Sequence, residues 1–407
     1  ARHWEVINAN SAEAYLRDYD FEKDAAKAVV ASSWMAYYNV IVDLNSLLAT
    51  IDERRDLFSN GNYELIKGEA KGLRAFLHFD ALRLWGPVPL GADTSRVAIP
   101  YVKEVMRDLG KLQSVSYGRV LREIIADLDE AEELLAADPV KTASTPYDDF
   151  QIDRQYRFNY YAVKATKARY YQWINQPVLA ANNAREVIEA VYGSGTTKIF
   201  TLATEHTVGG TKDVDPDLTM SVEHIFALHI PRFSPITEPF FYMGDCKQDI
   251  TAIAQAYETG FHSNDIRCKV NRYWEELQSP KKQAVFKKFY DPSARVSATV
   301  MPLIRLAEMY FIVMECSTLE EANERLTEFR VARVMEISIE NSLLTSSDVY
   351  SRLEREYRKD FYGEGQMFYF YKRHATPTLT WPTLVENIVY QVPKPEQQTN
   401  FELEQNK

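Results

Sequence analysis

The clearest structural signal in the 407-residue chain is the stretch Gly68-Glu69-Ala70-Lys71-Gly72-Leu73-Arg74-Ala75-Phe76-Leu77-His78-Phe79-Asp80-Ala81-Leu82-Arg83-Leu84-Trp85-Gly86-Pro87-Val88-Pro89-Leu90. Its apolar and aromatic residues recur at helical spacing, which predicts a helix over residues 63–84 with a buried aromatic stripe. Trp85-Gly86-Pro87 ends this helix, because proline disfavours helical backbone in the residue before it. The stretch therefore predicts a buried helix followed by a turn that prolines fix.

The same spacing predicts helices through the rest of the first half. From Tyr117 the apolar residues step by three and four, and Asp138-Pro139 ends that segment. Alanines in the segment after Phe158 favour the close approach of a neighbouring helix, and Pro177 suits a helix start because first-turn N–H groups are unpaired. Further helices are expected over residues 11–31, 32–55, 158–174 and 177–190.

Residues 193–300 are richer in glycine and proline than the segments on either side, and His224–Ile230 is predicted to form a short strand. We therefore expect one domain over residues 1–407. It comprises a helical scaffold (1–192 and 301–375), a variable loop-rich subdomain (193–300) and an extended C-terminal tail (376–407). Helices are expected to return at Met301, and again over residues 319–335 and 349–361. The fold class is mainly all-α, with minor β structure.

Composition excludes several classes of protein. The net charge is −11, from 47 basic and 58 acidic residues, and no basic run is present, so nucleic acid is not an expected partner. No stretch approaches the roughly 18 consecutive apolar residues of a membrane-spanning helix. The three cysteines include no C-x-x-C pair, which argues against a disulfide framework or a zinc cluster. A disulfide between Cys246 and Cys268 stays open.

The catalytic motifs are incomplete. Gly193–Lys198 lacks the full phosphate-loop spacing, and Glu223, His224 and His229 lack the H-E-x-x-H pattern of a metal site. No G-x-S-x-G nucleophile motif occurs. We therefore predict no catalytic residue, no metal ligand and no cofactor, and we expect that the chain is not an enzyme.

Aromatic residues in the loop-rich region are the best candidates for a ligand site. A flat ring exposed in a loop suits the apolar face of a sugar, with neighbouring polar groups to hold the hydroxyls. Tyr273 and Trp274, flanked by Asn271 and Arg272, fit this pattern best, and Tyr242 is a further candidate. Core packing is the alternative for each ring.

Six segments, in order, resemble motifs of the SusD/RagB family, the surface lipoproteins that accompany TonB-dependent transporters in Bacteroidetes. The first is the stretch 68–90, and the later ones are residues 125–131, 157–169, 223–228, 302–310 and 354–373. The resemblance implies degenerate tetratricopeptide-like helix pairs and an outer-membrane protein on the cell surface, anchored through a lipidated cysteine upstream of Ala1. It also implies capture of an oligosaccharide, or a peptide in some members, for a SusC-like TonB-dependent transporter.

The chain departs from the family pattern at Asn175-Gln176-Pro177, which replaces a Gly-Asp turn, and at Gln366, where the family often has arginine. The charged residues of the first motif, among them Arg83, are expected to serve as scaffold. Two other functions stay open: a tetratricopeptide-like scaffold that binds protein or peptide without a transport role, and a helical carbohydrate-active enzyme, for which no motif selects a carboxylate pair.

Overall fold

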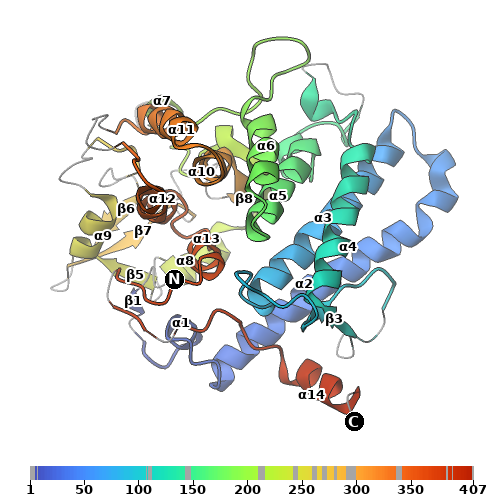
Figure 1. The fold of residues 1–407 in the computed structure, drawn as a ribbon, viewed down its shortest axis with the longest axis horizontal. Helices are drawn as coiled ribbons and strands as arrows, with labels where there is room; N and C mark the ends of the chain where they lie inside the picture. The colour runs from blue at the N-terminus through green and yellow to red at the C-terminus, as the bar shows by residue number, and fades with distance from the viewer. Residues whose placement is uncertain are drawn as a thin grey trace.

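The structure is a computed structural model and is mainly helical, as the sequence predicts. Helices α2 to α6, blue to green in Figure 1, form one side of the molecule, and helices α10 to α13, orange-brown to red, form the other. The structure describes residues 5–6, 8–106, 108, 112–142, 148–209, 216–241, 246–258, 264–267, 273–278, 282–289, 299–335, 342–381, 384–386 and 388–405.

The helices are α1 (Ala12–Arg17), α2 (Asp24–Thr50), α3 (Asn62–Trp85), α4 (Tyr117–Leu134), α5 (Tyr160–Trp173), α6 (Pro177–Ile188), α7 (Glu205–Gly209), α8 (Ser234–Phe241), α9 (Ile250–Tyr257), α10 (Leu306–Cys316), α11 (Leu319–Ala332), α12 (Ser346–Asp360), α13 (Gln366–Arg373) and α14 (Glu396–Gln405). The strands are β1 (Glu5–Val6), β2 (Val97–Pro100), β3 (Ser114–Ser116), β4 (His224–His229), β5 (Cys246–Asp249), β6 (Trp274–Glu276), β7 (Gln283–Phe286) and β8 (Val300–Arg305).

The predicted boundary between the first two helices is wrong. The chain breaks after α1, where Tyr19 adopts the left-handed conformation (φ 59°), and α2 then runs through residues 31 and 32 without interruption. Ser32 does not end α2, because its hydroxyl donates a hydrogen bond back to the carbonyl of Val29 (3.0 Å) and so stays within the helix.

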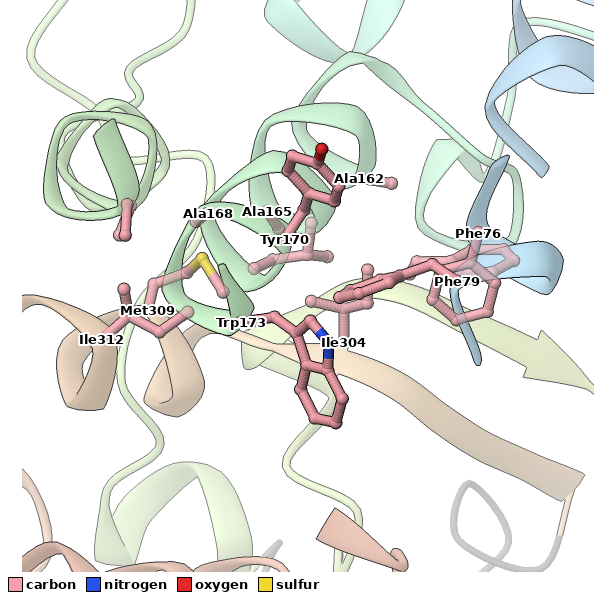
Figure 2. Packing of buried hydrophobic residues seen from close by; sticks show 14 of the residues in the cluster. Phe76, Phe79, Ala162, Ala165, Ala168, Tyr170, Trp173, Ile304, Met309 and Ile312 are labelled. Carbon is pink, nitrogen blue, oxygen red and sulfur yellow. The ribbon is translucent and has the colours of Figure 1, made fainter. Parts of the chain in front are cut away.

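Helix α3, the predicted signature helix, packs closely on its neighbours because two glycines lie at the contact. A methyl group built at Gly72 would lie 2.5 Å from the ring of Phe158, and one at Gly68 would lie 2.7 Å from Leu135. Further along the same helix, Phe76 and Phe79 meet Trp173 and Ile304 in the core (Figure 2). The glycines of the first motif thus allow backbone and ring to approach, which larger residues would prevent.

The helix predicted from Met301 begins later. Residues 300–305 form β8, which pairs antiparallel with the predicted strand β4, with Ala227 opposite Pro302 and His229 opposite Val300. Arg305 stays extended (φ −120°, ψ 154°), and α10 begins at Leu306. Pairing with β4 therefore overrides the helical pattern of this apolar segment.

A second hydrophobic cluster lies beside the main core. Its framework is the four-stranded sheet β1-β5-β7-β6 together with α9. Trp274, Phe286 and Tyr362 form its centre, with ring centroids 4.9 to 5.1 Å apart. The proposed division of the chain into scaffold and subdomain stays a prediction.

Buried ion pairs join elements of the two clusters. Asp360, at the end of α12, lies 2.8 Å from Arg305 and 3.0 Å from Arg333, and Glu223 bonds the same two arginines at 3.0 and 2.7 Å. Arg267 extends the group to Asp360 at 3.2 Å. All five side chains are at most 2% exposed, so removing any one of them leaves an uncompensated charge inside the protein.

The prediction of an extended C-terminal tail over residues 376–407 is wrong for its last part, because residues 396–405 form α14. The tail crosses the molecule and ends at the far side, next to the early helices (Figure 1). The amide of Gln391 donates to the carbonyl of Trp85 (3.0 Å), and that of Gln398 donates to the carbonyl of Leu112 (2.6 Å). These bonds tie the end of the chain to its first third.

Candidate functional site

The two predicted ligand residues that the structure describes are buried. Tyr273 is 3% exposed and Trp274 is 4% exposed, and Trp274 packs against Phe286 and Tyr362. Our expectation that these rings are exposed is therefore wrong. Trp274 opens β6, whose pairing with β7 sets it opposite Phe286 and turns its indole into the second cluster, so its ring offers no face to a sugar.

The other three predicted ligand residues, Tyr242, Asn271 and Arg272, lie outside the described residues. Cys268, one partner of the disulfide left open above, lies outside them as well. The aromatic run at residues 368–371 forms part of α13, where Phe370 and Tyr371 are buried at 3% exposure. Phe370 and Tyr371 therefore belong to the core rather than to a ligand surface.

Among the described residues, a concave site lined by both charged and aromatic side chains lies between the ends of α5 and α13, and we call it the α5–α13 cleft. Its volume is about 410 Å³, within the range of small-molecule sites. One wall is the loop 89–94, which follows the signature helix, and the start of α4 continues this wall. The opposite wall combines the ends of α5, α10 and α13, with Trp173, Glu315 and Arg373.

The local sequence shapes this cleft. Asn175 adopts the left-handed conformation (φ 56°), which ends α5, and Pro177 starts α6 in a new direction. Tyr117 stands at the first position of α4, and its hydroxyl accepts a hydrogen bond from the indole of Trp173 (3.0 Å). The turn that departs from the family pattern thus forms part of the wall of the cleft.

Charged and amide groups are fixed across the floor of the cleft. Arg373 donates two hydrogen bonds to Glu315, one of them at 2.7 Å, and Gln172 donates another at 3.0 Å. His374 lies 3.4 Å from the same carboxylate. Planar polar groups held in this way can receive and donate hydrogen bonds in set directions, as recognition of hydroxyl groups requires.

Glu315 is ionised at neutral pH. Burial alone raises the pKa of Glu315, but the ion pair with Arg373 and the neighbouring His374 outweigh burial and lower the pKa to about 2. The floor of the cleft therefore holds a fixed carboxylate–guanidinium pair. A carboxylate without a free proton has no proton to give as a general acid, so the pair suits binding better than acid catalysis.

Sequence reasoning missed this cleft because its parts are far apart in the chain. Trp173 and Arg373 lie in segments that the family resemblance covers, but neither motif indicates that they share a wall. The departures at Asn175 and Gln366 were a usable signal, since both residues lie at or beside the cleft. Only the fold shows that these positions meet.

Within the described ranges, no group of three or more His, Cys, Asp or Glu side chains is placed to hold a metal ion. Glu223 and His224, considered above as metal ligands, have other roles: Glu223 pairs with two arginines, and the Nε2 atom of His224 bonds the carbonyl of Thr219 (2.9 Å). No helix among the described residues combines the length and apolarity needed to cross a membrane.

Solved structures with the same architecture define the class of fold. A SusD superfamily protein from Bacteroides vulgatus matches with a TM-score of 0.71 at 17% identity, covering 98% of this chain and 89% of that one. A SusD superfamily protein from Bacteroides thetaiotaomicron matches with a TM-score of 0.69 at 18% identity, covering 90% and 83%. A SusD-like carbohydrate binding protein from Bacteroides vulgatus matches at 0.66 and 19% identity, covering 91% and 75%. The chain has the SusD fold.

Two sequence comparisons agree with this fold. Residues 2–172 match the SusD-like family described as starch-binding and associating with the outer membrane. A SusD-like protein of Formosa agariphila is 24% identical over 367 residues, which cover 81% of this chain and 67% of that protein. The first part of the chain thus resembles the SusD-like family and the whole chain has the SusD fold, in agreement with the resemblance to the SusD/RagB family seen in the motifs at residues 68–90 and beyond.

Proposed function

We propose that this chain is a cell-surface protein that binds a glycan and presents it to a SusC-like TonB-dependent transporter in the outer membrane. A lipidated cysteine upstream of Ala1 would anchor it there. The family description and the carbohydrate-binding relative support the ligand class. The observation that carries the proposal is the α5–α13 cleft, which combines a carboxylate, a guanidinium and an amide in fixed positions.

Binding is the first property to test. Titration calorimetry with maltoheptaose and with oligosaccharides of other backbones should give saturable heat for at least one glycan. Thr94→Trp should weaken that binding, because Thr94 is exposed and lines the mouth of the cleft. Ser95→Trp is the matched control, since Ser95 is the next exposed residue and does not line the cleft. Equal loss with both variants, or no binding to any glycan, would contradict the proposal.

The transport partner needs its own experiment. The full-length lipidated protein, extracted gently from its native outer membrane, should bring with it a large β-barrel transporter. Recovery with cytosolic partners instead would favour the scaffold alternative. The role is binding rather than catalysis, so glycans incubated with the protein should stay intact. Release of product that one carboxylate variant abolishes would revive the enzyme alternative.

A further inference from the structure

A small polar chamber adjoins the α5–α13 cleft. The two spaces share Gln172, Trp173 and Arg373 as lining residues, so the chamber lies directly beside the cleft. Its volume is about 20 Å³, enough for one water-sized group and too small for a sugar ring. A ligand that occupied both spaces would therefore keep its rings in the cleft and place a single substituent atom in the chamber.

Three guanidinium groups line the chamber, and two of them are fully engaged with a carboxylate. Arg169 donates to both oxygens of Glu308, at 2.7 and 2.5 Å, and Arg373 donates to both oxygens of Glu315. These two arginines therefore have their forks occupied by the protein itself. The third is Arg83, from the signature helix α3.

Arg83 has donor capacity left over. One of its terminal nitrogens bonds Asp80, and its guanidinium lies over the ring of Tyr369, 3.9 Å from the centroid. Its Nε–H has no hydrogen-bond partner among the described residues, although Arg83 is only 2% exposed. A buried donor without an acceptor is destabilising, so an oxygen atom that accepted from it would be stabilising.

Basic side chains outnumber carboxylates in the same region. Lys372 is fully buried, and its ammonium donates to the carbonyls of Gly86 (2.7 Å) and Leu84 (3.2 Å) rather than to any described carboxylate. Burial and the nearby Arg83 lower the pKa of Lys372 to about 7. The cations of the region are Arg83, Arg169, Lys372 and Arg373, and the carboxylates that face them are Asp80, Glu308 and Glu315.

We propose that the α5–α13 cleft selects glycans that carry an anionic substituent, a carboxylate or a sulfate ester, with one of its oxygens accepting a hydrogen bond from Arg83 in the chamber. The inference rests on the proposed glycan-binding function and names the class of glycan. An anion here supplies the missing acceptor in charged form, which makes the hydrogen bond from Arg83 stronger than one to a neutral hydroxyl. Arg83, expected from the sequence to be scaffold, thus becomes a specificity residue.

The test compares ligands that differ only in charge. The probes are a short oligogalacturonide and its methyl ester, titrated against the full chain. The acid should bind about ten-fold or more tightly than the ester, since a hydrogen bond to a charged group is about twice as strong as a neutral one. A sulfated oligosaccharide with its desulfated counterpart forms the second arm, and the pair with the larger difference identifies the substituent.

The variant is the double change Asp80→Asn with Arg83→Met, which removes the pair as a unit and leaves no unpaired carboxylate. It should abolish the preference for the acid while keeping affinity for the ester, and a thermal melt confirms that it folds. The single variant Arg83→Lys, which keeps the charge but loses the Nε–H, should reduce the preference. The control is Arg55→Met, which removes a positive charge from an exposed side chain outside the cleft.

Three outcomes would overturn the inference. Equal affinity within both ligand pairs would exclude selection of anions, and a preference that survives in the double variant would place the anion elsewhere. Binding of maltoheptaose without binding of any charged probe would reject the anionic class while the glycan-binding function stands. If no glycan binds, the proposed function falls, and a carboxylate-bearing peptide that binds in its place would support the scaffold alternative.

Discussion

At the scale of single residues, Trp274 shows how the local sequence can mislead. Polar neighbours on both sides of Tyr273-Trp274 suggested a ring exposed in a loop. A strand alternates its faces, so polar residues beside an aromatic one are equally typical of a strand that buries one side. The pairing of β6 with β7 decides the matter, because it places Trp274 opposite Phe286. That partner follows in the next short strand, and the residues around Trp274 do not by themselves indicate the pairing.

We expect Trp274→Ala to destabilise the protein by about 3–5 kcal/mol, as truncation of a buried aromatic residue does. Urea unfolding followed by circular dichroism measures the loss. Phe240→Ala is a suitable control, because Phe240 is 45% exposed and its removal should cost little. A Trp274→Ala protein that unfolds like the parent and yet loses glycan binding would contradict the buried placement.

Glu315 should make the stability depend on pH. Its folded-state pKa of about 2 lies below the ordinary value near 4.3, so its contribution is fully present above about pH 4.3 and is lost as the pH falls through about 2. Glu315→Gln should therefore cost about 1–3 kcal/mol at pH 7, because Arg373 loses its partner, and this difference should shrink towards pH 2. Chemical unfolding at several pH values measures it.

The matched control for Glu315 is Glu64→Gln, which alters a carboxylate that is 41% exposed and pairs with Arg55 on the surface. Surface pairs contribute little, so this variant should follow the parent at every pH. A constant difference between the parent and Glu315→Gln from pH 7 to pH 2 would show that Glu315 does not titrate in this range.

At the scale of elements, the sequence predicts helices best where a helix packs along one continuous stripe. The expected bounds of α3, α5 and α6 agree with the structure to within two residues. The prediction fails at β8, whose apolar run suits either a buried helix or a strand, because the deciding partner β4 lies some seventy residues earlier. The α5–α13 cleft could not be predicted for the same reason, since five separate segments form it.

The close contact between α3 and Phe158 gives a test of the signature helix. Gly72→Ala places a methyl group 2.5 Å from two ring carbons of Phe158, which is fully buried and has no room to move. We expect overpacking to lower the free energy of unfolding by about 1–3 kcal/mol, although alanine has a higher helix propensity than glycine. Thermal unfolding measures the loss, and a variant with Phe158→Leu in addition should recover part of it. A gain in stability from Gly72→Ala alone would refute the contact.

At the scale of the whole molecule, the buried ion pairs around Asp360 link the two hydrophobic clusters. Burial alone raises the pKa of Asp360, but Arg333, Arg305 and Arg267 outweigh it and hold this pKa well below its usual range. The charges are therefore retained inside the protein in fixed pairs, and the elements that carry them depend on one another. The spacing of apolar residues predicts the helices on either side of these charges. It does not predict that buried ion pairs connect them.

Asp360→Asn should cost about 3–5 kcal/mol, because three arginines lose a common partner in a buried setting. Unfolding in guanidinium chloride, followed by tryptophan fluorescence and by circular dichroism, measures this loss. The matched control is Asp56→Asn, a change on an exposed side chain that should leave the midpoint unchanged. A midpoint shift no larger than that of the control would show that the network adds nothing to stability.

The tail that ends in α14 also has a consequence for the order in which the chain assembles. Gln391 and Gln398 donate hydrogen bonds to the carbonyls of Trp85 and Leu112, about three hundred residues earlier. Contacts of such long sequence separation form slowly, because a large loop must close first. During synthesis the early helices leave the ribosome well before the tail is made. Until then the carbonyls of Trp85 and Leu112 lack the partners that the tail provides. Docking of the tail is then a late folding step. A chain truncated after α13 would keep its other helices, but the two carbonyls would be left to bond water or the backbone of another chain.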